Sequence, residues 1–384
     1  MPAKQSFYIP CLDGIRALAV MMVIVAHSGF EYLAPGGLGV TIFFFLSGFL
    51  ITTLLRIEAM TSGTISIRDF YLRRVYRILP PLYVTIAFVC VCAALHILEG
   101  PLDWAAIGLT CVFVTNYLPM LHVGIPTGGL ENLWSLAVEE HFYLVFPIAY
   151  FLLISRKVRR LWQSVAMAAA CLLVLLWRIY LIYYLHRPTG DSGRVYLYTD
   201  TRIDSILFGS LMAVAINPLL DSLPRFLRDN VGKFALCGVA LLAFTVAYRD
   251  ELFRDTYRYS LQGVALGLIF LFVVSSPERW QARWLENPVL KYLGRRSYVL
   301  YLIHFAIARE LFFDLRMSKF VTLPVSFALS LAFAEIMNRL VEEPMRRVKK
   351  RAMHSPFHAS VSTPEDATQP VESIAGAPPT AGAA

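Results

Sequence analysis

Apolar stretches long enough to cross a lipid bilayer recur along the whole chain. Of its 384 residues, 57% are hydrophobic and only 16% are charged, whereas about a quarter of the residues in a soluble domain carry charge. A bilayer-spanning helix needs about 20 mostly apolar residues, and the polar intervals between the apolar stretches are short. The sequence therefore predicts an all-α polytopic integral membrane protein without a separate soluble domain.

The distribution of basic residues indicates which apolar segments cross the membrane. The candidate segments are 12–31, 37–55, 78–97, 104–118, 133–154, 163–185, 203–216, 233–248, 258–275, 297–313 and 321–341. Short loops rich in Lys and Arg stay in the cytoplasm, and the basic loops alternate only if one segment between Arg77 and Arg156 does not cross. The segment 104–118 is the weakest, because its length at about 1.5 Å per residue is too short. We expect about ten transmembrane helices plus one short re-entrant or interfacial helix, with both termini in the cytoplasm.

The remaining compositional features add no further domain. Residues 1–351 are expected to form the transmembrane domain, and residues 352–384, rich in Ala, Pro, Ser and Thr, a disordered cytoplasmic tail. The six cysteines show neither zinc spacing nor a disulfide framework, so we expect no metal site. The net charge of +8 is explained by basic loops that orient the protein in the membrane. We therefore expect no nucleic-acid partner.

Two ionisable residues of the first apolar segment, Arg16 and His27, are the leading candidates for chemistry. Such side chains are costly at membrane depth and are functional candidates by default. They lie eleven residues apart, almost three helical turns, and so share one face about 16 Å apart along the axis. A histidine can take a proton from a hydroxyl that attacks a thioester, or carry the acyl group itself. An arginine can hold a phosphate or a carbonyl of the donor. The competing interpretation is that Arg16 extends to lipid headgroups and His27 only packs.

Four sequence motifs in fixed order carry a resemblance to a known family. They are Asp-Gly-Ile-Arg-Ala-Leu-Ala at 13–19 followed by His27, Gly-Val-Thr-Ile-Phe-Phe-Phe-Leu-Ser-Gly-Phe-Leu-Ile-Thr at 39–52, Phe-Tyr-Leu-Arg-Arg-Val-Tyr-Arg-Ile-Leu-Pro at 70–80, and Trp-Ser-Leu-Ala-Val-Glu-Glu-His-Phe-Tyr at 134–143. Weaker matches continue as far as 344. Together the motifs resemble the acyltransferase-3 family of membrane O-acyltransferases. One departure is His141, where the family more often shows glutamine.

The resemblance implies a function and a set of partners. It implies transfer of an acyl group, commonly acetyl from acetyl-CoA, to a carbohydrate or lipid-linked glycan acceptor at the bacterial cytoplasmic (inner) membrane. It also implies that Arg16 and His27 are the essential pair.

Other candidate residues have both a functional and a structural interpretation. Arg73, Arg74 and Arg77, expected on a cytoplasmic loop before a helix opened by Pro80 and Pro81, could bind the phosphates of coenzyme A or only satisfy the positive-inside rule. We expect them as the cofactor-binding residues.

The fourth motif and the ninth span, 297–313, contribute the remaining candidates. Adjacent helical residues are about 100° apart, so only one of Glu139 and Glu140 is expected to line the site. We favour Glu140 as the carboxylate that orients His27 or the acceptor, and we expect the other to pair with Arg178 or Arg202. The expected substrate-binding residues are Trp134, Glu139, Tyr301 and His304, although Trp134 also suits the membrane interface, and Tyr301 with His304 also suits hydrogen-bonded helix packing.

Two other functions compete with acyl transfer. A transporter or flippase for a glycan or lipid-linked intermediate would also bury charged residues, but the chain shows no internal repeat of the kind from which many transporters are built. A purely structural membrane protein would not need so many buried charges at motif spacing.

Overall fold

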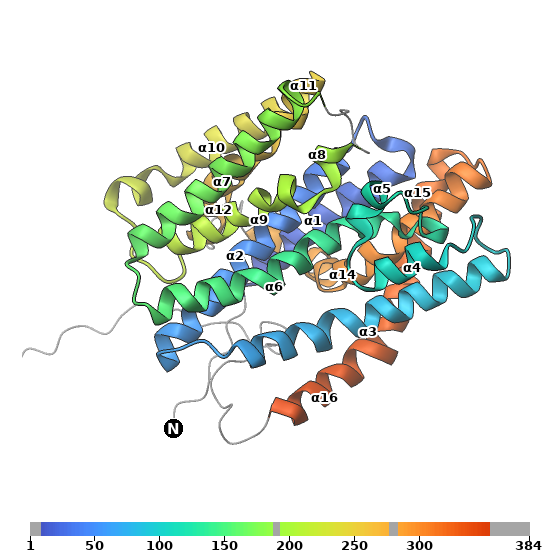
Figure 1. The fold of residues 1–384 in the computed structure, drawn as a ribbon, viewed down its shortest axis with the longest axis horizontal. Coiled ribbons are helices and arrows are strands. Elements are labelled where there is room, and N and C mark those ends of the chain that lie inside the picture. The colour runs from blue at the N-terminus through green and yellow to red at the C-terminus, as the bar shows by residue number, and fades with distance from the viewer. Residues whose placement is uncertain (1–8, 187–192, 276–282, 354–384) are drawn as a thin grey trace, which may run out of the picture.

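The computed structural model describes residues 9–186, 193–275 and 283–353. Throughout these residues the elements are helical, with no strand, and they pack side by side into one bundle (Figure 1). The prediction of an all-α polytopic membrane protein is confirmed. The expected disordered tail lies outside the described residues, except that a helix runs two residues into it, to Met353.

Ten helices of 16 residues or more form the body of the described part. They are α1 (Pro10–Val25), α2 (Gly36–Ser62), α3 (Ile67–Ala94), α6 (Trp134–Ser155), α7 (Arg160–Tyr183), α9 (Thr199–Ala215), α10 (Arg225–Ala247), α12 (Arg258–Ser275), α14 (Pro288–Arg309) and α15 (Lys319–Met337). Eight of them, all except α9 and α14, belong to segments long and apolar enough to cross a bilayer. They coincide with predicted spans.

The two exceptions occupy the other predicted spans, 203–216 and 297–313, and contain more polar residues. Helix α9 packs against α2, α7 and α12, and its Arg202 and Asp204 are fully buried. Helix α14 packs against α1 and α15 and begins with a basic stretch. Because protein surrounds α9, it tolerates charges that a lipid-facing helix does not. The basic stretch of α14 lies in its first turns, where Arg295 is exposed.

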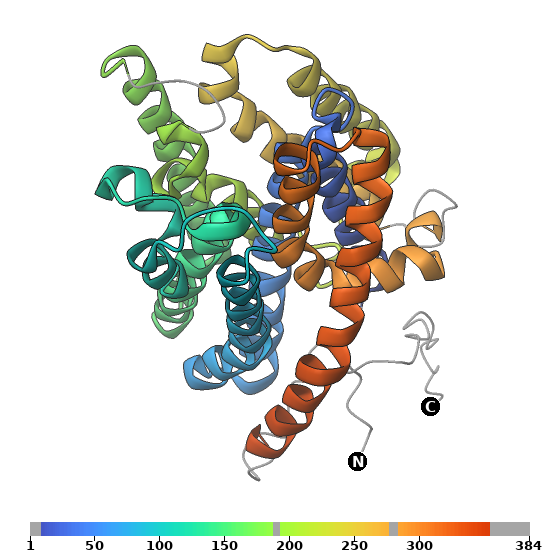
Figure 2. The ribbon, with the colours of Figure 1, turned by 90° about the vertical axis from the view of Figure 1, so that its right-hand side faces the viewer.

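Short helices lie between and beyond the long ones. They are α4 (Trp104–Cys111), α5 (Leu118–Leu121), α8 (Arg194–Leu197), α11 (Glu251–Thr256) and α16 (Glu343–Met353). The predicted non-crossing segment 104–118 contains α4, whose eight residues reach only about 12 Å. Helix α16 continues the direction of α15 through a π-helical turn at Asn338–Glu342, so that the two form one long column (Figure 2).

Helix α3 begins earlier than predicted. The expected segment started at residue 78 with the three arginines in a loop, but α3 starts at Ile67 and contains Pro80 and Pro81 in its interior. The side chain of Ser66 accepts a hydrogen bond from the backbone N–H of Asp69 and so caps the helix. Arg73, Arg74 and Arg77 are therefore held on a rigid helix.

Two glycines allow α2 and α9 to cross at backbone contact. A Cβ atom at Gly48 would lie 1.9 Å from the carbonyl oxygen of Ile206, and one at Gly209 would lie 1.9 Å from that of Phe45. Small residues at such crossings are the usual basis of close helix packing in membranes. This contact fixes α2, which carries the motif 39–52, against the interior helix α9.

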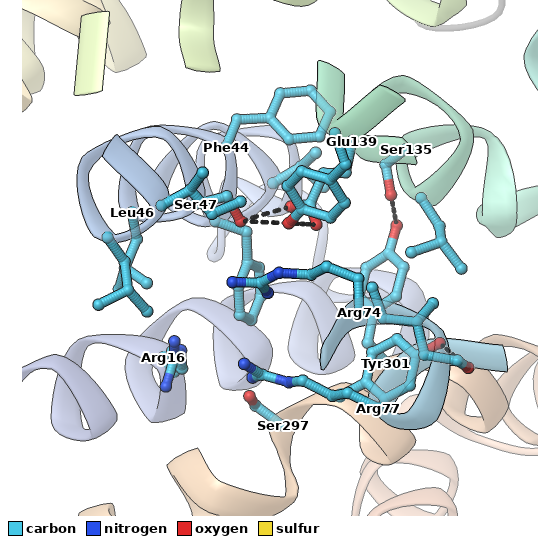
Figure 3. Close-up of a pocket in the computed structure, with 18 residues that line it drawn as sticks. Arg16, Phe44, Leu46, Ser47, Arg74, Arg77, Ser135, Glu139, Ser297 and Tyr301 are labelled. Carbon is cyan, nitrogen blue, oxygen red and sulfur yellow. Dashed lines mark hydrogen bonds between the residues drawn. The ribbon is translucent and has the colours of Figure 1, made fainter. Parts of the chain in front are cut away.

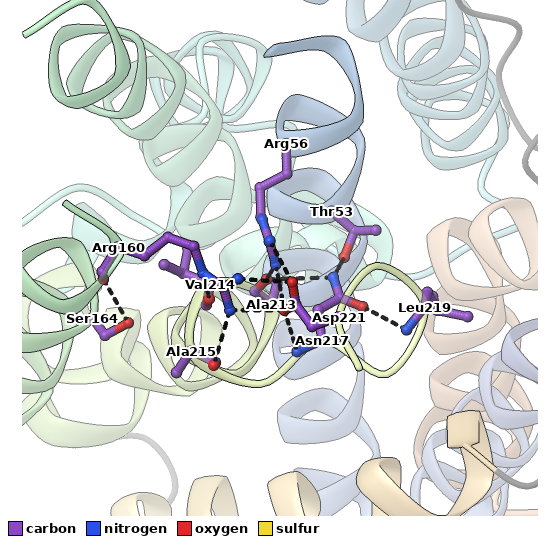
Figure 4. A network of polar contacts seen from close by, with 10 residues as sticks. All are labelled: Thr53, Arg56, Arg160, Ser164, Ala213, Val214, Ala215, Asn217, Leu219 and Asp221. Carbon is purple, nitrogen blue, oxygen red and sulfur yellow. Dashed lines mark hydrogen bonds and ion pairs between the residues drawn. The ribbon is translucent and has the colours of Figure 1, made fainter. Parts of the chain in front are cut away.

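An ion-pair network ties α2 and α7 to the end of α9 (Figure 4). The Asp221 carboxylate accepts hydrogen bonds from Arg56 at 2.9 Å and Arg160 at 2.8 Å. The two guanidinium groups also donate to the carbonyls of residues 213–215, where α9 ends, and so satisfy carbonyls that have no partner within the helix. Burial would raise the pKa of the Asp221 carboxyl, but hydrogen bonds from Arg56 and the Asn217 backbone outweigh it and lower the pKa.

The expected topology can be tested at the two ends of α6. His122 before this helix and Lys157 after it are both exposed, and the distribution of basic residues assigns them to opposite sides of the membrane. In a cysteine-free background, we expect His122→Cys to react with an impermeant maleimide on intact cells and Lys157→Cys to react only after permeabilisation. The reverse pattern would contradict the predicted orientation.

The α2–α9 crossing predicts a sharp difference between glycines. Gly209→Ala should destabilise the protein by about 1–3 kcal/mol or more, because overpacking forces the backbones apart. The matched control is Gly267→Ala on α12, where a new Cβ meets no atom within 4 Å. Thermal unfolding in detergent measures both, and equal midpoints for the two variants would refute the tight crossing.

Candidate functional site

Two adjoining cavities contain most of the candidate residues. The first, here named the basic cavity, has a volume of about 100 Å³ and is lined by Arg16, Arg74 and Arg77. The second, here named the histidine cavity, has a volume of about 1110 Å³ and is lined by His27. Arg16 and His27 thus both face cavities in the protein interior, one in each.

The basic cavity brings together three arginines from two helices. Figure 3 shows the guanidinium groups of Arg74 and Arg77 reaching from α3 toward Arg16 on α1. Arg16 donates a hydrogen bond to Asp13, one turn earlier, at 3.1 Å, and its side chain is 15% exposed. A concentration of guanidinium groups around a small hollow attracts anions, because each group offers paired N–H donors to phosphate or carboxylate oxygens.

Glu139 is the carboxylate that lines the basic cavity. It accepts hydrogen bonds from Ser47 at 3.1 Å and Tyr143 at 2.8 Å. Glu139 and Tyr143 are four residues apart and so share a face of α6. Ser47, contributed by α2, lies across the cavity from α3 (Figure 3).

The histidine cavity is wider and opens toward exposed loops. Its lining includes Tyr32 and Ile125, which are 79% and 63% exposed. Polar groups from several elements also line it, namely Glu31, Glu131, Asn132, Arg249, Arg254, Arg258 and Gln262. A cavity of this size with aromatic walls and a few polar groups is typical of a small-molecule or glycan site.

A local distortion of the first helix positions His27. Helix α1 ends at Val25 and continues as a π-helical turn over Ala26–Phe30, a feature common at functional sites. Gly29 within the turn has φ +90°, and a Cβ there would lie 2.6 Å from the ring of Phe312. The turn is anchored by Ser28, whose hydroxyl lies 3.2 Å from that of Ser326 on α15.

His27 contacts His304 of α14. Nδ1 of His27 lies 2.9 Å from Nε2 of His304, and the two rings are nearly parallel, with centroids 5.2 Å apart. Phe305 covers His27 from the side, with ring centroids 4.6 Å apart. The imidazole of His27 is therefore held by an aromatic ring and by a hydrogen bond at one nitrogen.

Val40 and Tyr301 line both cavities, which therefore adjoin at these two side chains. The Tyr301 hydroxyl lies 2.5 Å from that of Ser135 and donates to the carbonyl of Asn132 at 2.9 Å. These bonds tie α14 to the start of α6.

The structure separates some residues that the sequence grouped together. Arg73 does not line the basic cavity but pairs with Glu58 of α2 at 2.9 Å. Glu140, which we favoured over Glu139, lines neither cavity. Its side chain points about 100° away from that of Glu139 around the axis of α6. Trp134 lines the histidine cavity, whereas His304 is fully buried behind His27 and lines neither.

The expected pairing of a motif glutamate with Arg178 or Arg202 is wrong. Arg178 is fully buried and forms two hydrogen bonds with Asp204, at 2.9 and 2.7 Å. Arg202, also fully buried, lies 3.7 Å from the ring centroid of Tyr259, a cation–π contact. These pairings depend on how α7, α9 and α12 are rotated about their axes, which hydropathy does not reveal.

Sequence reasoning missed several polar residues of the cavities. Ser47 and Tyr143 bond Glu139, and both lie within motifs quoted above, so their position in the motif was the available signal. Arg249, Arg254 and Arg258 also line the histidine cavity, and sequence reasoning did not single them out. Within the described residues, no group of three or more His, Cys, Asp or Glu side chains gathers to hold a metal ion.

Comparison with known proteins identifies the class of protein. The sequence profile of an acyltransferase domain matches residues 9–338, most of the chain. The molecule is therefore a multi-pass membrane protein with an acyltransferase domain. It belongs to the acyltransferase-3 family, which confirms the resemblance seen in the motifs.

Two of the curated relatives that match the chain are named as O-acetyltransferases. A Staphylococcus aureus (strain COL) protein named as an O-acetyltransferase is 30% identical over 91% of this chain and 59% of its own length. The peptidoglycan O-acetyltransferase OatA of Listeria monocytogenes is 30% identical over 88% of this chain and 56% of its own. The chain thus spans between half and two thirds of the length of these relatives. No solved structure is significantly similar to it.

Proposed function

We propose that the protein transfers an acyl group, most simply acetyl, from cytoplasmic acyl-CoA to a hydroxyl of a surface polysaccharide or lipid-linked glycan. The observation that carries the proposal is the pair of adjoining cavities. One is lined by three arginines and the other by His27, and two side chains line both. The names of the relatives support acetyl as the group transferred and peptidoglycan as one acceptor class.

In this proposal the basic cavity serves the donor. The phosphates of acyl-CoA are attracted to Arg74, Arg77 and Arg16, which lie toward the end of α1 that the sequence assigns to the cytoplasm. A volume of about 100 Å³ admits only a part of the donor, so the rest lies outside this cavity. The thioester then approaches His27 past Val40 and Tyr301.

The histidine cavity serves the acceptor. Its exposed rim admits a sugar from the non-cytoplasmic side, and aromatic walls such as Trp134 and Tyr196 offer flat apolar faces to a sugar ring. The polar groups around it provide donors and acceptors for hydroxyls. In this arrangement neither substrate has to cross the whole membrane.

The reaction uses His27 as a general base. The imidazole takes the proton of the acceptor hydroxyl as its oxygen forms a bond to the thioester carbonyl carbon. When the tetrahedral intermediate collapses, the C–S bond breaks and the thiolate of CoA takes that proton. A route through an acyl-histidine uses the same residue as nucleophile.

A transporter or flippase would use the same cavities without breaking a thioester. The two functions differ in a single measurement, the release of free CoA. Movement of a glycan across proteoliposomes without CoA release would favour transport.

Replacement of His27 tests the proposed function. With the purified chain in nanodiscs, radiolabelled acetyl-CoA and an oligosaccharide acceptor, we expect His27→Ala to lower the rate of acyl transfer by about 10²- to 10⁴-fold, the usual contribution of a general base. His122→Ala is the matched control, since His122 is exposed and outside both cavities. Unchanged transfer by His27→Ala would refute the proposed role.

The basic cavity predicts a second result. Arg16→Lys keeps the charge but loses the paired N–H donors, so acyl-CoA turnover should fall at least tenfold while expression and thermal stability stay at the wild-type level. Arg68→Lys, on the exposed side of α3, is the control. Full turnover by Arg16→Lys would mean that charge alone is sufficient at this position.

A further inference from the structure

His304 has no access to either cavity, yet its contacts are specific. It lies within α14 with no exposed surface, and one edge of its ring faces the backbone of its own helix. Nδ1 lies 2.8 Å from the carbonyl oxygen of Tyr301 and 3.2 Å from that of Leu300. The other nitrogen, Nε2, faces Nδ1 of His27 at 2.9 Å.

These contacts determine which nitrogen of each ring carries a proton. A carbonyl oxygen only accepts hydrogen bonds, so Nδ1 of His304 is the donor. A neutral imidazole has a single N–H, and Nε2 of His304 is then an acceptor. The 2.9 Å contact therefore requires Nδ1 of His27 to donate, which leaves the lone pair of His27 on Nε2, at the ring edge directed away from His304.

We propose that His304 is a positioning residue that holds His27 in the tautomer with the proton on Nδ1, so that Nε2 is the atom that accepts the proton of the acceptor hydroxyl. The inference rests on the proposed function of His27 and assigns its reacting atom. It replaces the substrate-binding role expected for His304. A neutral imidazole here takes the place that a carboxylate has in many hydrolases, where the third group fixes the tautomer of the histidine.

The hydrogen bond also accounts for the charge that appears during the reaction. When Nε2 of His27 takes the proton, its ring becomes an imidazolium with two N–H groups. The Nδ1–H bond to the lone pair of His304 then becomes charge-assisted and stronger. The proton leaves Nε2 to the CoA thiolate, and the ring returns to its original tautomer without any proton passing to His304.

The π-helical turn and α14 fix the positions of His27 and His304 relative to each other. Val25 ends the regular part of α1, and the wider turn carries His27 beside α14. On the other side, the two backbone carbonyls fix the ring of His304. Backbone structure therefore determines the position of both rings, through the π-helical turn for His27 and through two carbonyl groups for His304.

Two variants of His304 separate positioning from packing. His304→Leu removes the acceptor, whereas His304→Gln keeps an amide oxygen near the position of Nε2. We expect kcat for acyl transfer to fall at least tenfold in His304→Leu, toward the 10⁴-fold that loss of the correct tautomer costs in a serine-protease triad, with KM for acyl-CoA unchanged. His304→Gln should recover most of the lost kcat.

A neighbour on the same helix provides the control. Leu302 is fully buried and lines neither cavity. Leu302→Ala should lower thermal stability without changing kcat of the folded protein. If both His304 variants resemble Leu302→Ala, with reduced stability and normal kcat, His304 is only a packing residue.

Nitrogen NMR of the full chain labelled with ¹⁵N-histidine gives a readout that does not depend on turnover. The signals of His27 are assigned by their loss in His27→Ala. We expect a protonated Nδ1 and an unprotonated Nε2 in the wild type, and loss of this preference in His304→Leu. A proton on Nε2 of His27 in the wild type overturns the inference even if the enzyme is active. The expected tautomer in a wild type that never releases CoA refutes the proposed function, and with it the catalytic meaning of the pair.

Discussion

The cost of placing charge at membrane depth governs this structure. Arg178 is offset by Asp204, and Arg202 by an aromatic ring. A buried pair of this kind is weak evidence for net stability, but removal of one partner leaves an uncompensated charge and is strongly destabilising. Such pairs therefore fix the rotation of each helix, and they leave a different group of arginines, on α1 and α3, to face a cavity.

Hydropathy and the distribution of basic loops predicted much of the fold, because each depends on the composition of one segment at a time. The ten predicted spans correspond to the ten long helices, and the segment 104–118 contains a helix too short to cross. The start of α3 was missed for a physical reason. Pro80 and Pro81 suggested a helix beginning, since proline suits a first turn, while the cap formed by Ser66 and Asp69 was the better signal.

Only part of the candidate site could be predicted from the sequence. Arg16 and His27 were recognisable because both are ionisable and lie within one apolar segment. By contrast, the choice between Glu139 and Glu140, the distance of Arg73 from the cavity and the partners of Arg178 depend on interhelical packing. A 100° rotation of one helix exchanges such neighbours, and no local pattern specifies it. The contact between His27 and His304 joins residues 277 positions apart, beyond any local spacing rule.

The boundary between the two cavities at Val40 and Tyr301 matters for the ion gradient that a membrane maintains. Cells store energy as ion gradients across membranes. A membrane protein with cavities open to both sides could let ions leak through. Here the hollows meet at a valine and a tyrosine whose hydroxyl is occupied by Ser135 and Asn132. An apolar side chain and a phenol whose hydroxyl is already hydrogen-bonded offer water few partners at this boundary. Such a boundary would let a protein that takes substrates from both faces of the bilayer remain an electrical insulator.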